Sequence, residues 1–219
     1  STLLSKHGLP LAVKIGGCEA ITDLRIAKEH DAKYVIAPMI ESVFALKKFI
    51  SSIEKIYEVG EVEEVNFSFN LETKTAFNIL EELSKTAHRV LDGIVFGRTD
   101  FTSSLELPNS QIDGETVTSA LLKVSKIADR ENLEFIVGGT LTRKSIEILR
   151  EVRKVHLSRF ETRKVVIDAK YLEVAQIEEI IDKSLAFELA WLMTKRQNPL
   201  LISKEDESRI KKIENLLIG

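Results

Sequence analysis

The sequence predicts an α/β fold in which parallel strands and covering helices close into a (β/α)8 (TIM) barrel. Short apolar runs alternate with helical stretches along almost the whole chain, a pattern typical of parallel strands covered by helices. Polar residues follow many of the strand candidates, and in a barrel these ends converge on one site. No glycine-rich dinucleotide loop follows the first strand, which argues against the rival open doubly wound sheet.

The strand candidates are short apolar runs bounded by turns, and the helix candidates repeat apolar residues at helical spacing. We predict strands over 11–15, 34–37, 65–71, 93–96, 133–137, 155–157 and 165–167, and helices over 19–29, 42–57, 73–86, 113–130, 143–152, 174–194 and 203–217. Asp113 is expected to cap its helix, and Ser203 with Asp206 to form the capping box of the last one. The polar stretch 101–112 is expected to be a loop at the rim.

Seven strands are one fewer than a closed barrel needs. The chain opens with residues typical of a helix end stopped by Gly8. We therefore expect the chain to lack an N-terminal strand segment of its barrel. Residues 1–219 are predicted to form a single barrel domain, in which residues 173–219 are C-terminal helices that pack on a neighbouring subunit.

Composition narrows the classes of function. The 219 residues are 44% hydrophobic and 30% charged, with a net charge of −3, which is ordinary for a soluble globular protein and gives no basic surface for nucleic acid. The lone Cys18 excludes an internal disulfide and a thiolate metal cluster. No apolar run reaches the roughly 20 residues that a membrane-spanning helix needs. We expect a cytoplasmic protein without nucleic-acid or membrane partners.

Two carboxylates follow consecutive strand candidates. Glu72 ends the strand 65–71, and Asp100 follows the strand 93–96 through the turn Gly97-Arg98-Thr99. Adjacent parallel strands lie roughly 5 Å apart, so the two side chains can meet one hard divalent cation, which prefers carboxylate oxygens and water. The spacing alone equally allows Glu72 to cap the next helix and Asp100 to cap a turn.

The same segments resemble a known family. Residues 70–73 and 91–105, with Asp92-Gly93 before the strand and Gly97-Arg98-Thr99-Asp100 after it, are similar to the metal-site pair of the HpcH/HpaI aldolase and citrate lyase beta-subunit family. Lys14-Ile15 and residues 37–42 resemble two earlier strand ends of that family. The resemblance extends from about Leu11 to about Phe160.

This resemblance implies a TIM barrel that binds Mg²⁺ or Mn²⁺ through the residues matching Glu72 and Asp100. It further implies that backbone N–H groups of Gly97, Arg98, Thr99 and Asp100 hold a substrate carboxylate, since successive N–H groups in a turn form a concave anion site. Asn70 matches a polar residue of the same pocket, and the period of two places it on the same strand face as Glu72.

The sequence departs from the family pattern at two positions. Lys14 stands where the family has an arginine that polarises the ketone oxygen, and a lysine supplies a point charge instead of a bidentate fork. We expect Lys14 to stabilise a developing enolate oxygen as a catalytic residue; the alternatives are a Schiff base or a structural ion pair with Glu19 or Glu41. The family's acid–base histidine lies on a strand upstream of this chain, so no acid–base residue is assigned.

Other polar residues follow later strand candidates. Gly138-Gly139-Thr140 either receives an anion or forms a tight turn. Arg159, Glu161 and Arg163 either bind a distal group of the substrate or form an ion-pair network, which is the simpler interpretation.

We therefore expect a metal-dependent carbon–carbon lyase that acts on a 2-oxo acid through an enolate, in a homo-oligomer. The alternative is a degenerate barrel that serves as a ligand-binding or assembly subunit. Phosphoryl transfer is a weaker third possibility, because no phosphate-binding loop of the Walker type is present.

Overall fold

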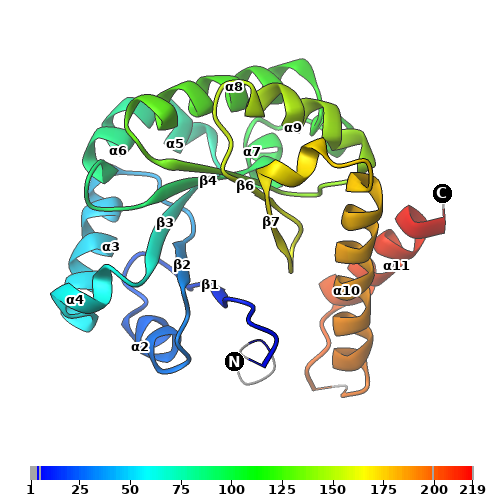
Figure 1. Cartoon of the computed structure of the whole chain (residues 1–219), viewed down its shortest axis with the longest axis horizontal. Helices are drawn as coiled ribbons and strands as arrows, with labels where there is room; N and C mark the ends of the chain where they lie inside the picture. The colour runs from blue at the N-terminus through cyan, green and yellow to red at the C-terminus, as the bar shows by residue number, and fades with distance from the viewer. Residues whose placement is uncertain (1–3, 5, 199, 219) are drawn as a thin grey trace.

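The fold is a curled, mostly parallel seven-stranded sheet with helices around its convex side. The computed structural model describes residues 4, 6–198 and 200–218. The strands follow one another in chain order: β1 (Ala12–Lys14), β2 (Tyr34–Ala37), β3 (Asn66–Leu71), β4 (Gly93–Gly97), β5 (Glu134–Gly138), β6 (Arg159–Glu161) and β7 (Val166–Asp168). Strands β1 to β6 are parallel, and β7 returns antiparallel to β6. Figure 1 shows the half-barrel that results.

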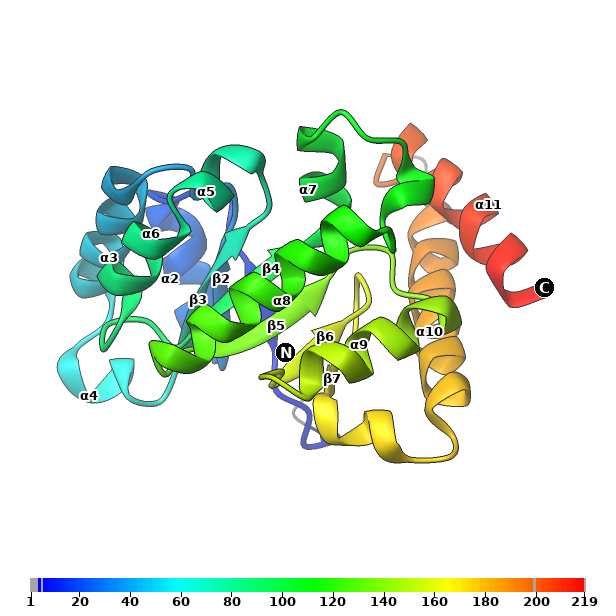
Figure 2. The same cartoon turned by 90° about the horizontal axis from the view of Figure 1, so that it is seen from above.

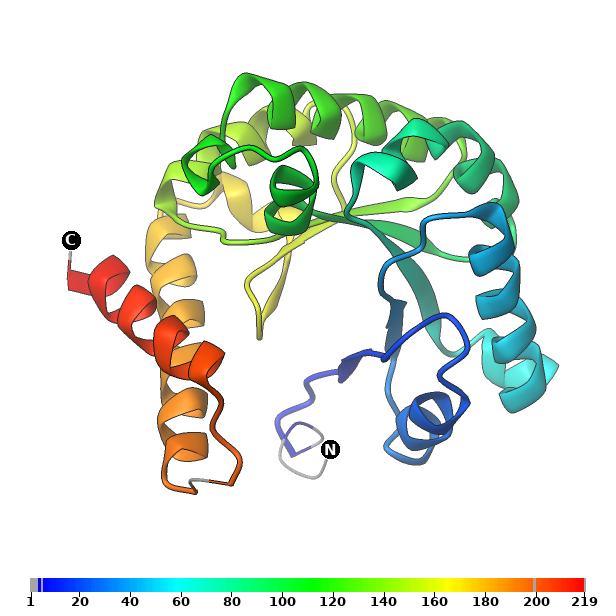
Figure 3. The same cartoon turned by 180° about the vertical axis from the view of Figure 1, so that it is seen from behind.

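The helices alternate with the strands and form an arc outside the sheet (Figures 1 and 3). They are α2 (Ile21–Glu29), α3 (Val43–Ile56), α4 (Val59–Val62), α5 (Lys74–Asn78), α6 (Leu80–Ala87), α7 (Arg98–Ser104), α8 (Glu115–Arg130), α9 (Ile146–Arg153), α10 (Ile177–Arg196) and α11 (Lys204–Ile218), with short 3-10 turns η1 (Asn109–Gln111), η2 (Arg143–Ser145) and η3 (Ala169–Glu173). The α/β alternation is confirmed. Among the described residues β1 and β7 do not pair, so the seven strands form an open half-barrel, consistent with the predicted TIM-type barrel that lacks one strand segment in this chain.

The two faces of each strand differ in chemistry. In β3, Phe67 and Phe69 are buried in the apolar core beneath the helices, while Ser68 and Asn70 alternate with them and so point to the concave side. The same alternation places Arg159 and Glu161 on the concave side of β6, on either side of the fully buried Phe160. The outer layer therefore holds the fold together, and the concave side carries most of the polar groups.

The predicted sixth strand was misplaced. Residues 155–157 lie in the turn after α9, where His156 contacts the carbonyl oxygen of Leu133 at 2.9 Å, and the strand begins at Arg159. The seventh strand was expected to be parallel, but the Thr162 N–H donates to the carbonyl oxygen of Val165 (2.9 Å) and closes a β6–β7 hairpin. A short turn of this kind joins antiparallel strands only.

Three further expectations change in the segments before and after β4. The predicted loop 101–112 begins inside a helix, because α7 spans Arg98–Ser104. Asp113 does not cap α8, which starts after Gly114 without a side-chain cap. The Asp113 carboxylate instead pairs with the buried Arg98. The predicted helix 73–86 is interrupted at Ile79, which separates α5 from α6.

The C-terminal helices pack against each other through a buried ion pair. The Glu188 carboxylate of α10 is fully buried and accepts two hydrogen bonds from Arg209 of α11, at 2.7 and 2.8 Å. The predicted capping box of α11 is confirmed, since the Asp206 N–H donates to Ser203 Oγ (3.1 Å) and the Ser203 N–H donates to Asp206 (2.9 Å). None of the helices in the described part of the chain has the length and apolar character that spanning a bilayer requires.

Candidate active site

Glu72 lies at the carboxyl end of β3, directly beside Gly97 at the end of β4. The register pairs Leu71 with Phe96, so the next residues of both strands are neighbours. A Cβ atom at position 97 would lie 2.8 Å from the Cβ of Glu72, which is shorter than any normal contact. Glycine at 97 therefore lets the Glu72 side chain lean across β4 toward α7.

The Glu72 carboxylate is almost fully buried and held by three donors. Its Oε1 accepts from the Met39 N–H at 2.9 Å, and its Oε2 accepts from Asn70 Nδ2 at 2.7 Å. The Lys14 Nζ lies 3.4 Å from Oε2. Met39 has φ of 52°, a conformation that non-glycine residues adopt rarely and that clusters at functional sites. Sequence reasoning missed Met39, because a backbone donor leaves no side-chain signal.

Glu72 does not cap the following helix, so one structural alternative is wrong. The N-cap of α5 is Thr73, whose Oγ1 accepts from the Ala76 N–H at 3.2 Å. We also considered Glu19 as a structural partner of Lys14. That alternative is wrong, because Glu19 pairs with Lys48 at 2.8 Å. Lys14 is instead half-exposed on the concave side, with Glu72 as its partner.

Asp100 lies in the first turn of α7, close to Glu72. Burial raises the pKa of the Asp100 carboxyl, the negative charge of Glu72 raises it further, and a hydrogen bond with the Glu72 side chain acts in the same direction. Lys14 and Arg163 lower it by a smaller amount. The charge of Glu72 therefore disfavours the ionised form of Asp100, and a divalent cation bound by both would offset this repulsion.

Asn70 leaves one polar atom without a partner at this site. Its side chain is 3% exposed, and while Nδ2 donates to Glu72, Oδ1 has no hydrogen-bond partner among the described residues. Buried acceptors are almost always satisfied. A donor brought by a ligand or its bound water fits this position.

The side chain of Arg98 is structural. It is fully buried, and its Nη1 pairs with Asp113 at 2.5 Å while Nη2 donates to the carbonyl oxygen of Gly139 at 2.7 Å. Burial lowers the pKa of Arg98, and the Asp113 charge opposes that effect. The guanidinium therefore fixes the loop after β5 to α7, and only the backbone N–H of Arg98 is left to contact a substrate.

Gly139 lies against the first N–H groups of α7. It has φ of +89°, and a Cβ atom there would lie 2.6 Å from the Thr99 nitrogen and 2.9 Å from the Arg98 nitrogen. These N–H groups have no acceptor inside their own helix. Glycine at 139 thus leaves free a small space beside these nitrogens that a side chain would fill, which we call the anion cradle. The hydroxyl of Thr99 lies next to this space, with its Oγ1 3.1 Å from Thr140 Oγ1. The Gly138-Gly139-Thr140 and Gly97–Asp100 motifs meet here; Figure 2 shows α7 at this end of the sheet.

Glu161 approaches the same region from β6. A Cβ atom on Gly138 would lie 2.7 Å from Glu161 Oε1, so the carboxylate leans across β5. Burial raises the pKa of the Glu161 carboxyl. The positive charges of Lys14 and Arg159 lower this pKa, and the negative charge of Glu72 raises it further. The expected ion-pair network applies to its neighbours, since Arg159 pairs with Glu134 and Arg163 with Glu205. Glu161 itself has no ion pair among the described residues, so the network interpretation does not apply to it.

The residues present are compatible with a metal ion held mainly by substrate and water. Among the described residues, no group of three or more His, Cys, Asp or Glu side chains is arranged to hold a metal. Glu72 and Asp100 would supply two carboxylates, which suits Mg²⁺, an ion that keeps several waters. The raised pKa of Asp100 and the unpaired Asn70 Oδ1 agree with this arrangement.

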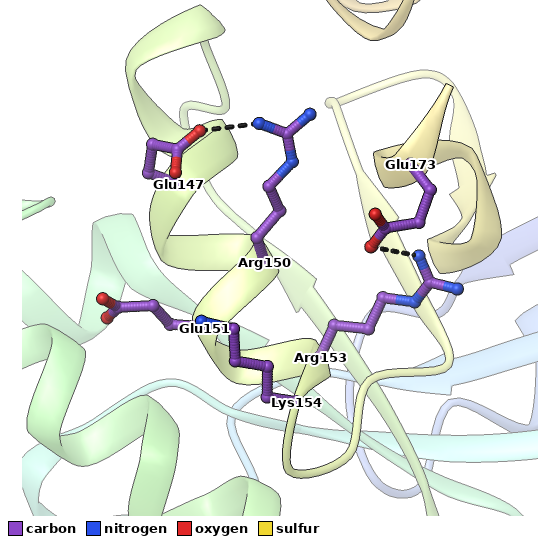
Figure 4. A pocket seen from close by; sticks show the side chains of 6 residues that line it. All are labelled: Glu147, Arg150, Glu151, Arg153, Lys154 and Glu173. Carbon is purple, nitrogen blue, oxygen red and sulfur yellow. Dashed lines mark hydrogen bonds and ion pairs between the residues drawn. The ribbon is translucent and has the colours of Figure 1, made fainter. Parts of the chain in front are cut away.

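Several surface hollows lie away from this site. The one in Figure 4, of about 370 Å³, is lined by Glu147, Arg150, Glu151, Arg153, Lys154 and Glu173 on the outside of the sheet. Its charges pair with each other, Arg150 with Glu147 at 2.7 Å and Arg153 with Glu173 at 2.8 Å. Exposed pairs of this kind contribute little, and the two remaining side chains, Glu151 and Lys154, are exposed surface charges of opposite sign that do not by themselves indicate a ligand.

The sequence model of the HpcH/HpaI aldolase/citrate lyase family matches residues 14–166, well over half of the chain. The chain belongs to this family. A comparison with curated proteins gave no match. The matched segment includes Lys14, Glu72, Asp100 and Glu161, so the site lies wholly within the part that defines the family.

Solved structures support the same fold. A citrate lyase from Burkholderia xenovorans LB400 is 18% identical with a TM-score of 0.57, covering 94% of this chain and 71% of that one. An HpcH/HpaI aldolase from Desulfitobacterium hafniense DCB-2 is 14% identical with a TM-score of 0.57, covering 74% and 69%. Macrophomate synthase is 16% identical with a TM-score of 0.56, covering 87% and 69%. Family membership supports an enzyme of the aldolase or lyase type.

Proposed function

We infer that the protein is a metal-dependent carbon–carbon lyase acting on a 2-oxo acid through an enolate. The observation that carries this proposal is the proximity of Glu72, which follows β3, to Asp100 in the first turn of α7, where burial and the charge of Glu72 raise the pKa of Asp100. A site that disfavours two close negative charges gains most from a cation. Bound Mg²⁺ or Mn²⁺ would act as a Lewis acid toward the ketone oxygen of the substrate.

Each predicted site residue has a role in this scheme. Glu72 and Asp100 hold the metal, and the Met39 N–H and Asn70 Nδ2 orient the Glu72 carboxylate toward it. The Lys14 ammonium stabilises the negative charge that develops on the enolate oxygen when the carbon–carbon bond breaks. A Schiff base at Lys14 is not needed in this scheme.

The substrate carboxylate is assigned to the backbone N–H groups of the segment Gly97–Asp100. The glycine at 139 supports this assignment, because its missing Cβ leaves space above the Arg98 and Thr99 nitrogens. The hydroxyl of Thr99 adds a polar contact at the same place. Binding of the carboxylate here and of the metal at Glu72 would orient a 2-oxo acid across the end of β4.

We further propose a homo-oligomer in which the C-terminal helices, residues 173–219, pack on a neighbouring subunit. Large apolar side chains on α10 support this, since Phe187, Trp191 and Met193 are 47%, 53% and 42% exposed. Apolar side chains gathered on one exposed helix are typical of interaction surfaces. Sedimentation analysis of the wild type and of Trp191→Lys tests the assembly, and a monomeric wild type contradicts it.

Turnover tests the proposed reaction. We expect Mg²⁺-dependent cleavage of 4-hydroxy-2-oxo acids to pyruvate and an aldehyde, abolished by EDTA and restored by Mg²⁺ or Mn²⁺. Glu72→Gln should lower kcat/KM by about 100-fold or more, the order of effect of losing a key electrostatic group. Binding of 2-oxo acids without any cleavage would instead support the alternative, a ligand-binding or assembly subunit.

A further inference from the structure

The β6–β7 hairpin carries two cations to the end of the sheet where the candidate site lies. Strand β6 is parallel to β5, so the hairpin turn follows the carboxyl-terminal end of the strands. The turn is closed twice, because the Thr162 N–H donates to the Val165 carbonyl oxygen (2.9 Å) and the Val165 N–H donates to Thr162 Oγ1 (3.2 Å). The two residues between them, Arg163 and Lys164, are exposed. Figure 3 shows this hairpin on the concave side of the sheet.

The two side chains at the tip of the hairpin have different neighbours. The Lys164 Nζ lies 5.5 Å from the centre of the Trp191 ring on α10. The positive charge of Arg163 instead lowers the pKa of the Asp100 carboxyl, and so does that of Lys14, which is an effect of nearby charges. Lys14 lies on β1 and Arg163 follows β6, so the two cations approach the site from opposite sides of β4.

Arg163 has a partner that it can exchange. Its Nη2 donates to Oε1 of Glu205 on α11 at 2.6 Å, and the two side chains are 50% and 73% exposed. Exposed pairs of this kind contribute little to stability. A guanidinium has five N–H donors, and this is the one side-chain hydrogen bond that Arg163 makes in the part of the chain that the structure describes. Donors therefore remain for a second acceptor.

The other arginines near the strand ends are committed to structure. Arg98 is fully buried and pairs with Asp113. Arg159 is largely buried, with its side chain 15% exposed, and pairs with Glu134. Arg163 differs from both, because a change of its partner breaks no buried interaction.

The proposed reaction assigns protein groups to one end of the substrate only. The metal and Lys14 contact the ketone oxygen, and the anion cradle holds the first carboxylate. The atoms beyond C3 have no assigned partner. A carboxylate at that end would match the planar fork of a guanidinium, which binds carboxylates through two parallel hydrogen bonds.

Resting on the proposed function, we propose that Arg163 is a specificity-determining residue, which exchanges Glu205 for a second carboxylate at the far end of the substrate. The site would then favour 2-oxo dicarboxylic acids over 2-oxo acids of the same length with an apolar end. Glu205 competes for the same guanidinium, so α11 limits the affinity for such a substrate. Because Glu205 lies outside residues 14–166, this competition is not part of the segment that the family model matches.

Calorimetric titration with saturating Mg²⁺ tests the exchange with two matched pairs of ligands. 2-Oxoglutarate is compared with 2-oxopentanoate, and 2-oxoadipate with 2-oxohexanoate, so the members of a pair have one chain length and differ only in the far carboxylate. In at least one pair, we expect the wild type to bind the dicarboxylate about tenfold more tightly or better, the order of effect of a hydrogen bond between charged groups.

Variants of both partners assign this preference to Arg163. Arg163→Gln should remove the preference and change the Kd of pyruvate by less than about threefold, as expected for a surface substitution away from that ligand. Arg163→Lys should retain part of it, because a lysine keeps the charge without the fork. Glu205→Gln should strengthen dicarboxylate binding by about two- to fivefold, the range for loss of an exposed competing pair. Arg153→Gln is the matched control, because Arg153 also pairs with one glutamate, Glu173, but outside the sheet.

The ratio of affinities within a pair separates specificity from structure. A structural role of Arg163 would weaken both members of a pair equally in Arg163→Gln, and that result overturns the proposal. A preference that survives in Arg163→Gln also overturns it, as does a wild type that binds pyruvate but distinguishes neither pair. A wild type that does not bind pyruvate with Mg²⁺ overturns the proposed function, and this inference with it. If Arg163→Gln does not fold, Arg163→Lys decides, and an undiminished preference in that variant contradicts the proposal.

Discussion

The two ends of the sheet gather polar groups in different ways. At the amino-terminal ends of β3, β4 and β5, the polar groups have partners: Asp92 accepts from the Phe67 N–H at 2.6 Å, and Glu134 accepts from Asn66 and Arg159. Like charges meet at both ends, since Glu134 raises the pKa of Asp92 and Glu72 raises that of Asp100, but at the carboxyl-terminal ends Asn70 Oδ1 is also buried without a partner beside Glu72. The comparison teaches that the polar groups at the amino-terminal ends have structural partners, whereas the candidate site includes a buried acceptor, Asn70 Oδ1, that has none among the described residues.

The two buried side-chain atoms without hydrogen bonds illustrate the contrast. Among the described residues these are Arg159 Nε and Asn70 Oδ1. The first belongs to a guanidinium that is paired with Glu134 and stacked on Tyr34, which compensates in part for the missing bond. Asn70 Oδ1 has no such compensation and lies beside Glu72.

Removing the Arg98 side chain should have the largest effect on the free energy of unfolding, because this side chain connects α7 to the Gly138-Gly139-Thr140 segment after β5. Arg98→Met deletes an ion pair with Asp113 and the hydrogen bonds to carbonyl oxygens after β5. Breaking a buried ion pair from one side costs about 3–5 kcal/mol. Urea unfolding should show a loss of this order. A loss below about 1 kcal/mol would mean that the α7–β5 connection does not depend on this side chain.

Gly139→Ala should have an intermediate effect on the free energy of unfolding. It tests whether the space beside the Arg98 and Thr99 nitrogens belongs to the substrate site. The added methyl group would lie 2.6 Å from the Thr99 nitrogen at a φ of +89°, so we expect a loss of about 1–3 kcal/mol, typical of a strained backbone position. Pyruvate affinity measured by calorimetry should fall as well. The control is Gly60→Ala on the exposed α4, where nothing lies within 4 Å. Unchanged pyruvate affinity would remove the cradle from the site.

Asp100→Asn should have the smallest effect on the free energy of unfolding. Whether the variant is more or less stable than wild type tests the repulsion between Glu72 and Asp100. The folded-state pKa of Asp100 is raised, so its contribution to the stability of the metal-free protein is favourable at low pH and is lost as pH rises through that pKa. The variant should therefore be slightly more stable than wild type at neutral pH without metal, and the difference should disappear near pH 3. Thermal unfolding across this range with EDTA measures it; a destabilised variant at neutral pH contradicts the repulsion.

Much of the outer layer could be predicted from the sequence. Strand β3 alternates buried aromatic residues with polar ones, β4 is a short apolar run between two glycines, and the helices repeat apolar residues at their own period. The positions of Lys14, Asn70 and Glu72 at strand ends follow from these patterns alone, and so does the position of Asp100 shortly after β4, although not its place in the first turn of α7. The resemblance to the family then indicated which of the polar strand ends belong together.

The remaining features depend on contacts between distant segments. The β6–β7 hairpin was missed because Val165 and Ile167 have the same apolar character in a parallel or an antiparallel strand. The helical start of α7 was missed because its anchor, Arg98, is held by Asp113 and by carbonyl oxygens after β5. Met39 contributes a backbone N–H, which leaves no local sequence signal.

The most direct test of the central claim is calorimetric titration of pyruvate into the protein with and without Mg²⁺, repeated with Asp100→Ala. If Glu72 and Asp100 hold a cation that binds the substrate, pyruvate binds the wild type only when Mg²⁺ is present. Asp100→Ala then loses at least about tenfold in affinity, or 1.4 kcal/mol. Equal affinity in all four conditions would contradict the metal site and the proposed reaction together.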